Sequence, residues 1–231
     1  MPFSRRNALK LGAGAVGAGV LAAELHSQIL APEPANAASK QDLAPDQALQ
    51  QLLEGNQRFV KSKRRNPNQT MVRLKEIAQE QKPFAAVLGC ADSRVPVEIV
   101  FDQGFGDLFV CRVAGNVATP EEIGSLEFGC AVLGTKVIVV LGHERCGAIA
   151  ATIKGTQVPG QIGSLLDAIR PAAQQVSNQT GDRLLNTCKA NVRLQVKRLK
   201  ASPVIAQLIQ DNKLKIVGGY YDLDTGAVTL V

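Results

Sequence analysis

The stretch Lys136-Val-Ile-Val-Val-Leu-Gly-His-Glu-Arg-Cys-Gly147 is an apolar run that stops at a histidine and a cysteine three residues apart. The run is rich in β-branched residues without alternating polar ones, which is typical of a strand buried on both faces of a parallel sheet. A second run, 84–89, ends in the same way and is followed by Cys90. Ligands collect at the carboxyl ends of strands in open α/β sheets, so we expect Cys90, His143 and Cys146 to meet there.

Strands and helices alternate along the rest of the chain. The same criteria predict strands at 84–89, 107–113, 136–142, 214–220 and 227–231, and helices at 46–60, 71–81, 96–101, 120–133, 162–176 and 184–200. We therefore expect an α/β fold: a mainly parallel sheet of four to five strands flanked by helices, with an antiparallel edge strand from the final hairpin. The first two helices precede the sheet, so we expect them to pack on the outside or on a partner subunit.

Length and composition limit the classes of function. The chain has 231 residues, of which 45% are hydrophobic, and this is enough for one domain with a sizeable core. The net charge of +6 suggests a nucleic-acid partner, but the chain has no Trp, and its basic clusters at 61–65 and 197–200 lie near the ends of predicted helices. A nucleic-acid groove needs a continuous basic stripe, so we expect no nucleic-acid partner.

Residues 1–37 have the features of an export signal peptide. The segment Ser-Arg-Arg-Asn-Ala-Leu-Lys at 4–10 resembles a twin-arginine signal, a weakly hydrophobic core follows at 11–23, and Ala-Asn-Ala at 35–37 supplies small residues for cleavage. Ala8 stands where the twin-arginine pattern usually has Phe, so general export remains an alternative.

The same segment bears on membrane attachment and location. A bilayer span needs about 20 apolar residues, more than the core at 11–23 provides, so we expect no stable membrane anchor. We predict that residues 38–231 form the mature domain. Its expected location is the periplasm or another extracytoplasmic compartment, such as a thylakoid lumen.

Five cysteines in an exported chain raise the alternative of disulfides. Cys111 lies in a strand pattern, and Cys130 and Cys188 lie on apolar helix stripes, so we expect these three to be buried free thiols. A disulfide between Cys90 and Cys146 is the competing interpretation, but it would leave His143 without a role.

A metal site accounts for the residue types at the two strand ends. Two thiolates and one imidazole suit Zn²⁺, and three protein ligands leave the fourth tetrahedral position open, as in catalytic sites. If a helix begins at 145–147, its dipole also stabilises the Cys146 thiolate. We therefore predict one catalytic Zn²⁺ per chain, bound by Cys90, His143 and Cys146.

The segment Cys90-Ala-Asp-Ser-Arg94 brings two charged groups to this site. An extended segment points residues 90, 92 and 94 the same way. Asp92 could ligate the zinc itself or accept a hydrogen bond from zinc-bound hydroxide, while Arg94 pairs with the carboxylate and orients it. A simple surface ion pair is the alternative.

Together these motifs mark a known family. Cys-x-Asp-x-Arg, followed 53 positions after its Cys by His-x-x-Cys-Gly, closely resembles the β-class carbonic anhydrases, and the similarity runs from about Asp46 to Val231. The resemblance implies reversible hydration of CO₂ to bicarbonate and a proton by zinc-bound hydroxide, and a dimer as the smallest unit. It also implies roles for five residues: Cys90, His143 and Cys146 as zinc ligands, and Asp92 and Arg94 as the catalytic pair.

The chain departs from the family pattern at two positions. A bicarbonate-regulated branch carries Trp three residues before the first Cys, where this chain has Val87, so we expect that regulatory site to be absent. The unregulated branch carries a hydrogen-bonding Gln near the zinc. The nearest candidate, Gln103, lines up one position off, which leaves its role open.

The ligand set also predicts how the reaction depends on pH and buffer. Two thiolates cancel the charge of Zn²⁺, so the pKa of bound water falls less than with neutral ligands, and we expect activity to grow toward alkaline pH. After cleavage His143 is the only histidine left, so buffer must carry much of the proton. Two alternatives remain: a carbonyl sulfide or carbon disulfide hydrolase on the same scaffold, and a non-catalytic zinc-binding assembly protein.

Overall fold

A computed structural model describes residues 42–231. The predicted export signal at 1–37, and the cleavage point that would follow it, lie outside the described residues. Within the described part of the chain, no helix combines the length and the apolar character needed to cross a bilayer.

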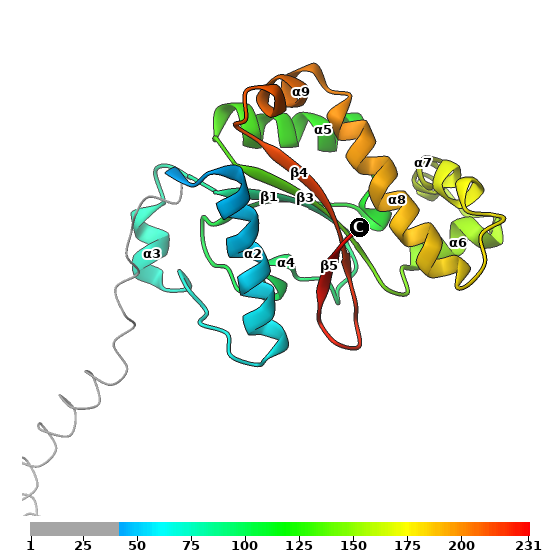
Figure 1. Ribbon diagram of the computed structural model, residues 1–231, viewed down its shortest axis with the longest axis horizontal. Coiled ribbons are helices and arrows are strands. Elements are labelled where there is room, and N and C mark those ends of the chain that lie inside the picture. Colours follow the sequence, from blue (N-terminus) through cyan, green and yellow to red (C-terminus); the bar gives the residue numbers. More distant parts are fainter. Residues whose placement is uncertain (1–41) are drawn as a thin grey trace, which may run out of the picture. The chain divides into compact units, whose positions relative to one another are not determined.

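Five strands form one sheet with the order β2-β1-β3-β4-β5 (Figure 1). The strands are β1 Ala85–Gly89, β2 Leu108–Arg112, β3 Val137–His143, β4 Lys215–Tyr221 and β5 Val228–Leu230. The first four pair in parallel, and β5 pairs with β4 in the antiparallel sense at the edge. The α/β fold predicted from the sequence is confirmed, including its antiparallel edge strand.

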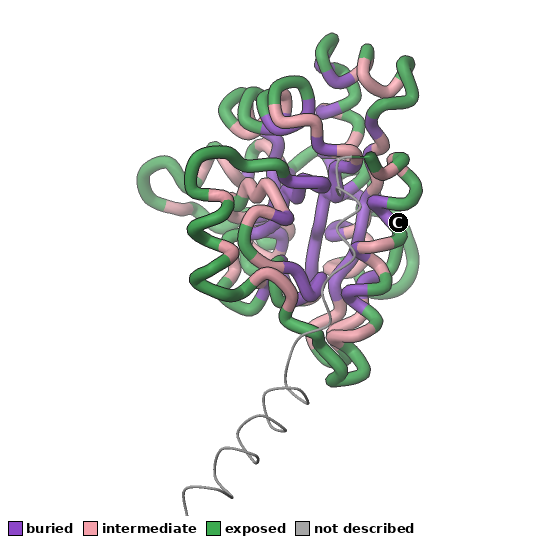
Figure 2. Tube along the Cα trace, turned by 90° about the vertical axis from the view of Figure 1, so that its left-hand side faces the viewer, coloured by how far each residue is buried: buried purple, intermediate pink, exposed green. Residues whose placement is uncertain are grey.

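Helices cover both faces of this sheet. They are α2 Pro45–Val60, α3 Met71–Glu76, α4 Val97–Val100, α5 Pro120–Glu127, α6 Gly147–Lys154, α7 Ile162–Gln175, α8 Arg183–Lys200 and α9 Pro203–Gln210. Helices α2 and α4 pack against one face, and α5, α8 and α9 pack against the other (Figure 1). Figure 2 shows the buried residues concentrated on the central strands between these layers.

The unbroken apolar runs in the sequence arise from this two-sided burial. Every residue of β1 and β3 is buried. In β1, Val87 packs into the cluster with α2 and α4, whereas Leu88 packs into the cluster with α5, α8 and α9. Because both faces are apolar, these strands have no polar alternation.

Several helix boundaries differ from the predictions. The predicted helix at 71–81 is shorter, and none of the residues of α3 is buried. Pro96 is the N-cap of α4 and not its first helical residue. The helix predicted over 120–133 ends at Glu127 and continues as a π-helical turn, Phe128–Val132. Helix α9 was not predicted, although Ser202 caps it and Pro203 begins it, which is an ordinary helix start.

The cysteine predictions are confirmed with one exception. All five cysteines are free thiols, so no disulfide joins Cys90 to Cys146. Cys130 and Cys188 are buried as expected. Cys111 is only half-buried, because β2 is an edge strand with a neighbour on one side alone among the described strands.

Helix α8 lies unusually close to the sheet, at two glycines. A Cβ atom on Gly142 would lie 2.6 Å from Val192 Cγ2, and a Cβ atom on Gly218 would lie 2.6 Å from Val192 Cγ1. Real side chains do not approach so closely, so both positions require glycine while Val192 is present. The side chain of Val192 therefore packs directly against the backbone of β3 at Gly142 and of β4 at Gly218.

A buried carboxylate joins α2 and the loop after it to the turn after α4. Asp102, after α4, accepts hydrogen bonds from Arg58 Nε (2.6 Å), Arg65 N (3.0 Å) and Asn66 N (2.9 Å). Burial alone would raise the pKa of Asp102, but the three hydrogen bonds outweigh it and hold the pKa below its usual value. The ionised carboxylate thus fixes the end of α2 and the loop after it.

We predict that Asp102→Asn lowers the free energy of unfolding by about 2 to 3 kcal/mol at pH 7, because a buried charged acceptor is lost. The folded-state pKa is depressed, so this stabilisation is complete above the unfolded pKa of about 3.9 and is lost as pH falls through the folded pKa. Urea unfolding at one protein concentration should therefore show the two proteins converging below about pH 4.

Asp46→Asn is the matched control, because Asp46 forms an exposed ion pair with Lys215. We expect it to change stability by about 0.5 kcal/mol or less. Equal destabilisation by the two substitutions would contradict the proposed role of Asp102.

Candidate metal centre

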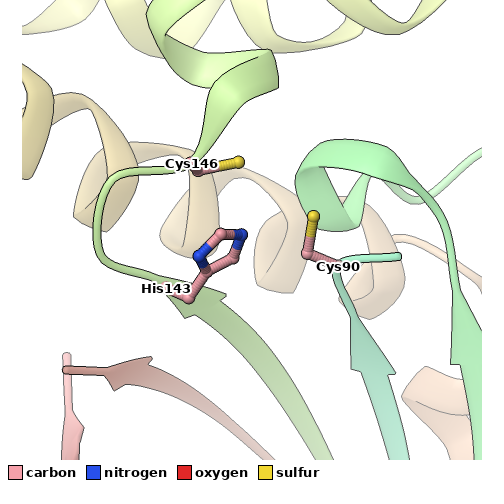
Figure 3. Close-up of side chains that lie close together, drawn as sticks. All are labelled: Cys90, His143 and Cys146. Atoms are coloured by element: carbon pink, nitrogen blue, oxygen red, sulfur yellow. The ribbon is translucent and has the colours of Figure 1, made fainter. Parts of the chain in front are cut away.

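The three predicted ligands meet at the carboxyl ends of two adjacent strands (Figure 3). Cys90 directly follows β1, His143 ends β3, and Cys146 is the N-cap of α6. Strands β1 and β3 are neighbours in register, with Gly89 opposite Leu141, so they end at the same edge. The two Sγ atoms and a ring nitrogen all lie within 4.8 Å of one another, and all three residues are buried.

The ring of His143 has a fixed orientation and tautomer. Its Nδ1 lies 2.8 Å from the backbone carbonyl oxygen of Glu144. A carbonyl can only accept, so Nδ1 carries the proton and Nε2 carries a lone pair. Nε2 is buried and has no hydrogen-bond partner among the described residues. A buried nitrogen without a partner is costly, and a metal ion at this position removes the cost.

Each cysteine lies beside a backbone dipole that favours a thiolate. Gly115 N donates a hydrogen bond to Cys90 Sγ (3.3 Å), and Cys146 stands at the N-terminus of α6, as predicted. A hydrogen bond from the Cys146 thiol lowers the pKa of Cys90 to about 4, and the resulting Cys90 thiolate together with burial raises the pKa of Cys146. Two thiolates this close are stable together only with a cation between them. The donor set therefore fits Zn²⁺.

Asp92 and Arg94 lie beside this site as a bidentate pair. Arg94 Nε donates to Asp92 Oδ1 (2.9 Å), and Arg94 Nη2 donates to Asp92 Oδ2 (2.8 Å). These bonds hold the pKa of Asp92 well below its usual value. Asp92 Oδ2 is 3.9 Å from His143 Nε2, but Asp92 does not belong to the group of three ligands. Arg94 thus holds the carboxylate within 3.9 Å of the ligand nitrogen of His143.

Two supporting contacts were not predicted from the sequence. Arg112, at the end of β2, donates from Nε to Cys90 O (2.9 Å) and from Nη2 to Asp92 O (2.6 Å), which fixes the backbone that carries both residues. On α8, Asn191 Nδ2 donates to Gly115 O (2.9 Å) and so holds the turn that donates to Cys90. The position of Arg112 at the end of a predicted strand could have indicated that it supports the site. Nothing in the sequence around Asn191 indicated its contact with Gly115.

Gln103 lies away from the three ligands. It is buried in the turn between α4 and β2, and its Nε2 donates to Phe101 O (2.9 Å). It lines a cavity with Phe105 and Leu108 near the start of β2. Leu108 pairs with Ala85, the first residue of β1, so this cavity is at the opposite end of the strands from Cys90.

An α/β sheet with two cysteines and one histidine at its carboxyl edge, leaving one coordination position open, defines a zinc protein of the catalytic type. The carbonic anhydrase family model matches residues 85–228. Carbonic anhydrase 2 of Mycobacterium tuberculosis is 38% identical over 191 residues, which cover 80% of this chain and 92% of that protein. The carbonic anhydrase of Mycolicibacterium smegmatis is 38% identical over 192 residues, which cover 80% of this chain and 93% of that protein.

Solved structures agree with this assignment. A tetrameric β-carbonic anhydrase from Sordaria macrospora superimposes with a TM-score of 0.65 at 25% identity, covering 68% of this chain and 85% of that one. The β-carbonic anhydrase CafA of Aspergillus fumigatus superimposes with a TM-score of 0.64 at 28% identity, and the match covers 68% of this chain and 79% of that one. This chain belongs to the β class of the carbonic anhydrase family.

We predict that Asn191→Ala accelerates the release of zinc to excess chelator by about tenfold, because outer partners of a metal ligand contribute on this scale. The change removes the hydrogen bond to Gly115 O and so loosens the turn that donates to the Cys90 thiolate. The release is followed by the absorbance of the chelator complex. Asn186→Ala is the control, since Asn186 is on the same helix but is only half-buried, and its side-chain Nδ2 donates to Thr180 O, away from the ligands. Equal release rates for the two variants would refute this role.

Proposed function

We propose that the reversible hydration of CO₂ to bicarbonate and a proton takes place at the Cys90–His143–Cys146 site, with Asp92 and Arg94 as the catalytic pair. The single observation that carries the proposal is the buried His143 Nε2, which has no hydrogen-bond partner among residues 42–231 and lies 3.9 Å from Asp92 Oδ2. When bound there, Zn²⁺ supplies Lewis acidity, which lowers the pKa of a water molecule enough to make it a nucleophile.

In this proposal Asp92 orients the nucleophile and Arg94 orients Asp92. The depressed pKa keeps Asp92 ionised at neutral pH, so its carboxylate accepts a hydrogen bond from the attacking water and leaves a lone pair of that water directed at CO₂. Arg94 occupies one lone pair on each carboxylate oxygen and adds a hydrogen bond from its own backbone N to Asp92 Oδ1 (2.9 Å). These contacts fix the rotation of the carboxylate.

We predict that Asp92→Asn lowers kcat for CO₂ hydration about a hundredfold or more, with one zinc per chain retained, because the acceptor is lost but the ligands are intact. Cys90→Ser should lose both zinc and activity, whereas Cys130→Ser, a buried thiol outside the site, should keep both. Stopped-flow hydration and metal analysis test this.

A Cys90→Ser variant with full activity would refute the site. Turnover of carbonyl sulfide or carbon disulfide, measured in parallel, separates the sulfur-substrate alternative. Bound zinc without any turnover would indicate the non-catalytic alternative.

The product proton must leave without a second histidine. His143 is used by the metal, and the other histidine in the chain, His26, lies in the predicted export signal. We therefore predict that the hydration rate rises with buffer concentration at constant pH and ionic strength. An equal concentration of inert salt should not reproduce the rise. A rate independent of buffer would contradict this part of the proposal.

A homodimer is the proposed functional unit. Strand β2 leaves one edge unpaired among the described strands, and such edges are normally covered. Phe128, whose ring lies 6.5 Å from that of Phe109 on β2, and Phe105 are both exposed, as is Met71 on α3. Burial of these apolar side chains against a second copy accounts for their exposure in one chain. Sedimentation of the purified protein measures the assembly.

Export is also part of the proposal. The Arg-Arg pair at positions 5 and 6, the apolar segment after it and the Ala-Asn-Ala site support removal of residues 1–37 and delivery of 38–231 to the periplasm or a similar compartment. Folding before transport by a twin-arginine route would allow zinc to bind before the thiolates meet an oxidant. The mature N-terminus, sequenced from fractionated cells, tests this.

A further inference from the structure

We infer that Asp224, in the turn between β4 and β5, is a positioning residue of the zinc site and acts through Arg145. Arg145 belongs to the metal-ligand loop, defined here as residues 143–147, which carries two of the three ligands. The catalytic part of this inference rests on the proposed function, whereas its effect on the metal does not.

Arg145 is joined to the hairpin by a two-pronged contact. Its Nη1 donates to Asp224 Oδ2 (3.0 Å) and its Nη2 donates to Asp224 Oδ1 (2.6 Å). Parallel bonds of this kind fix the orientation of both partners. Nη1 also donates to Glu144 Oε1 (2.9 Å), so the guanidinium is held in place from two directions.

The backbone of the metal-ligand loop needs such support. Arg145 has a φ of +51°, in the left-handed region that side-chain-bearing residues rarely adopt. A conformation of this kind persists only where the surroundings enforce it. Two further bonds connect the loop to the hairpin: Glu144 N donates to Tyr221 O (2.9 Å), and Leu223 N donates to Glu144 Oε2 (3.1 Å).

The turn at 222–226 can hold Arg145 in this conformation because hydrogen bonds fix the turn itself. Asp222 Oδ1 accepts hydrogen bonds from Asp224 N (3.0 Å), Thr225 N (2.8 Å) and Thr225 Oγ1 (2.8 Å). Gly226 N and Asp222 O close the turn at 2.9 Å. Asp224 is therefore presented to Arg145 from a fixed frame.

The position of Arg145 affects both the metal and the catalytic pair. Arg145 stands between His143 and Cys146, so rotation of its peptide changes the spacing of two ligands. Its carbonyl oxygen also accepts a hydrogen bond from Arg94 Nη2 (3.4 Å), and Arg94 holds Asp92. The chain of contacts thus runs from Asp224 through Arg145 to Arg94 and Asp92.

An exposed ion pair with a purely structural role would behave differently. The side chains of Arg145 and Asp224 are 48% and 68% exposed, and pairs so exposed add little to global stability. Loss of Asp224 should therefore leave thermal unfolding almost unchanged and act on the metal-ligand loop.

Asp224→Asn tests the inference in the zinc-loaded protein. The control is Asp167→Asn, because Asp167 pairs with Arg170 on α7 and the two side chains are 67% and 51% exposed. We expect Asp224→Asn to release zinc to excess chelator about three- to tenfold faster than the control, at an equal unfolding temperature. When the variant is loaded with cobalt in place of zinc, the visible absorption bands of the cobalt ion should shift. In the zinc-loaded variant, kcat for CO₂ hydration should fall with little change in KM. The conservative variant Asp224→Glu should recover most of the lost kcat.

Arg145→Asn provides the second arm. Asn tolerates a positive φ, so this change removes the guanidinium with little backbone strain. It should reproduce Asp224→Asn, and the double variant should release zinc no faster than either single one. Zinc release equal to that of Asp167→Asn, or additive effects in the double variant, would overturn the inference. Because zinc release is measured without turnover, absence of CO₂ hydration would refute the proposed function and leave this inference standing.

Discussion

The parallel pairing of β1 with β3 is the constraint on which the metal site depends. Burial on both faces fixes this pairing, since a slip of one residue would move Val87 and Leu88 to the wrong layers of the core. The register places Gly89 opposite Leu141, and the residues just beyond the two strand ends then supply the ligands. Hydrophobic packing in the centre of the protein thus sets the distance between the Cys90 sulfur and the His143 imidazole at the carboxyl edge of the sheet.

The charges at this edge are balanced in two groups. Two thiolates offset the charge of Zn²⁺, and the Asp92 carboxylate is offset by the Arg94 guanidinium. The zinc ion with its ligands and the Asp92–Arg94 pair would thus add little net charge to this edge, which suits a neutral substrate such as CO₂. Dipoles refine this balance: the Gly115 N–H at Cys90 and the N-terminus of α6 at Cys146 stabilise the sulfurs without adding charge.

The sequence predicted those parts of the fold and the site that arise from local pattern. Unbroken apolar runs identified β1 and β3, and the Cys and His residues after them identified the ligands. The residues of a strand do not show whether the strand is central or at an edge of the sheet. The sequence therefore predicted a buried Cys111, whereas this residue is half-buried. The contacts of Asn191 with Gly115 and of Arg145 with Asp224 join residues 76 and 79 positions apart, and such contacts follow only from the packed structure.

The fit of Val192 between Gly142 and Gly218 ties the catalytic edge of the sheet to one turn of α8. No side chain can be added at either glycine while the valine keeps its size, so a substitution of either glycine should be accompanied by a change at Val192 as the family diverges. A homologue with alanine in place of Gly142 would need a smaller residue in place of Val192. If the valine were kept, α8 would have to move away from the sheet, and Asn191, which here donates to Gly115 O, would move with it.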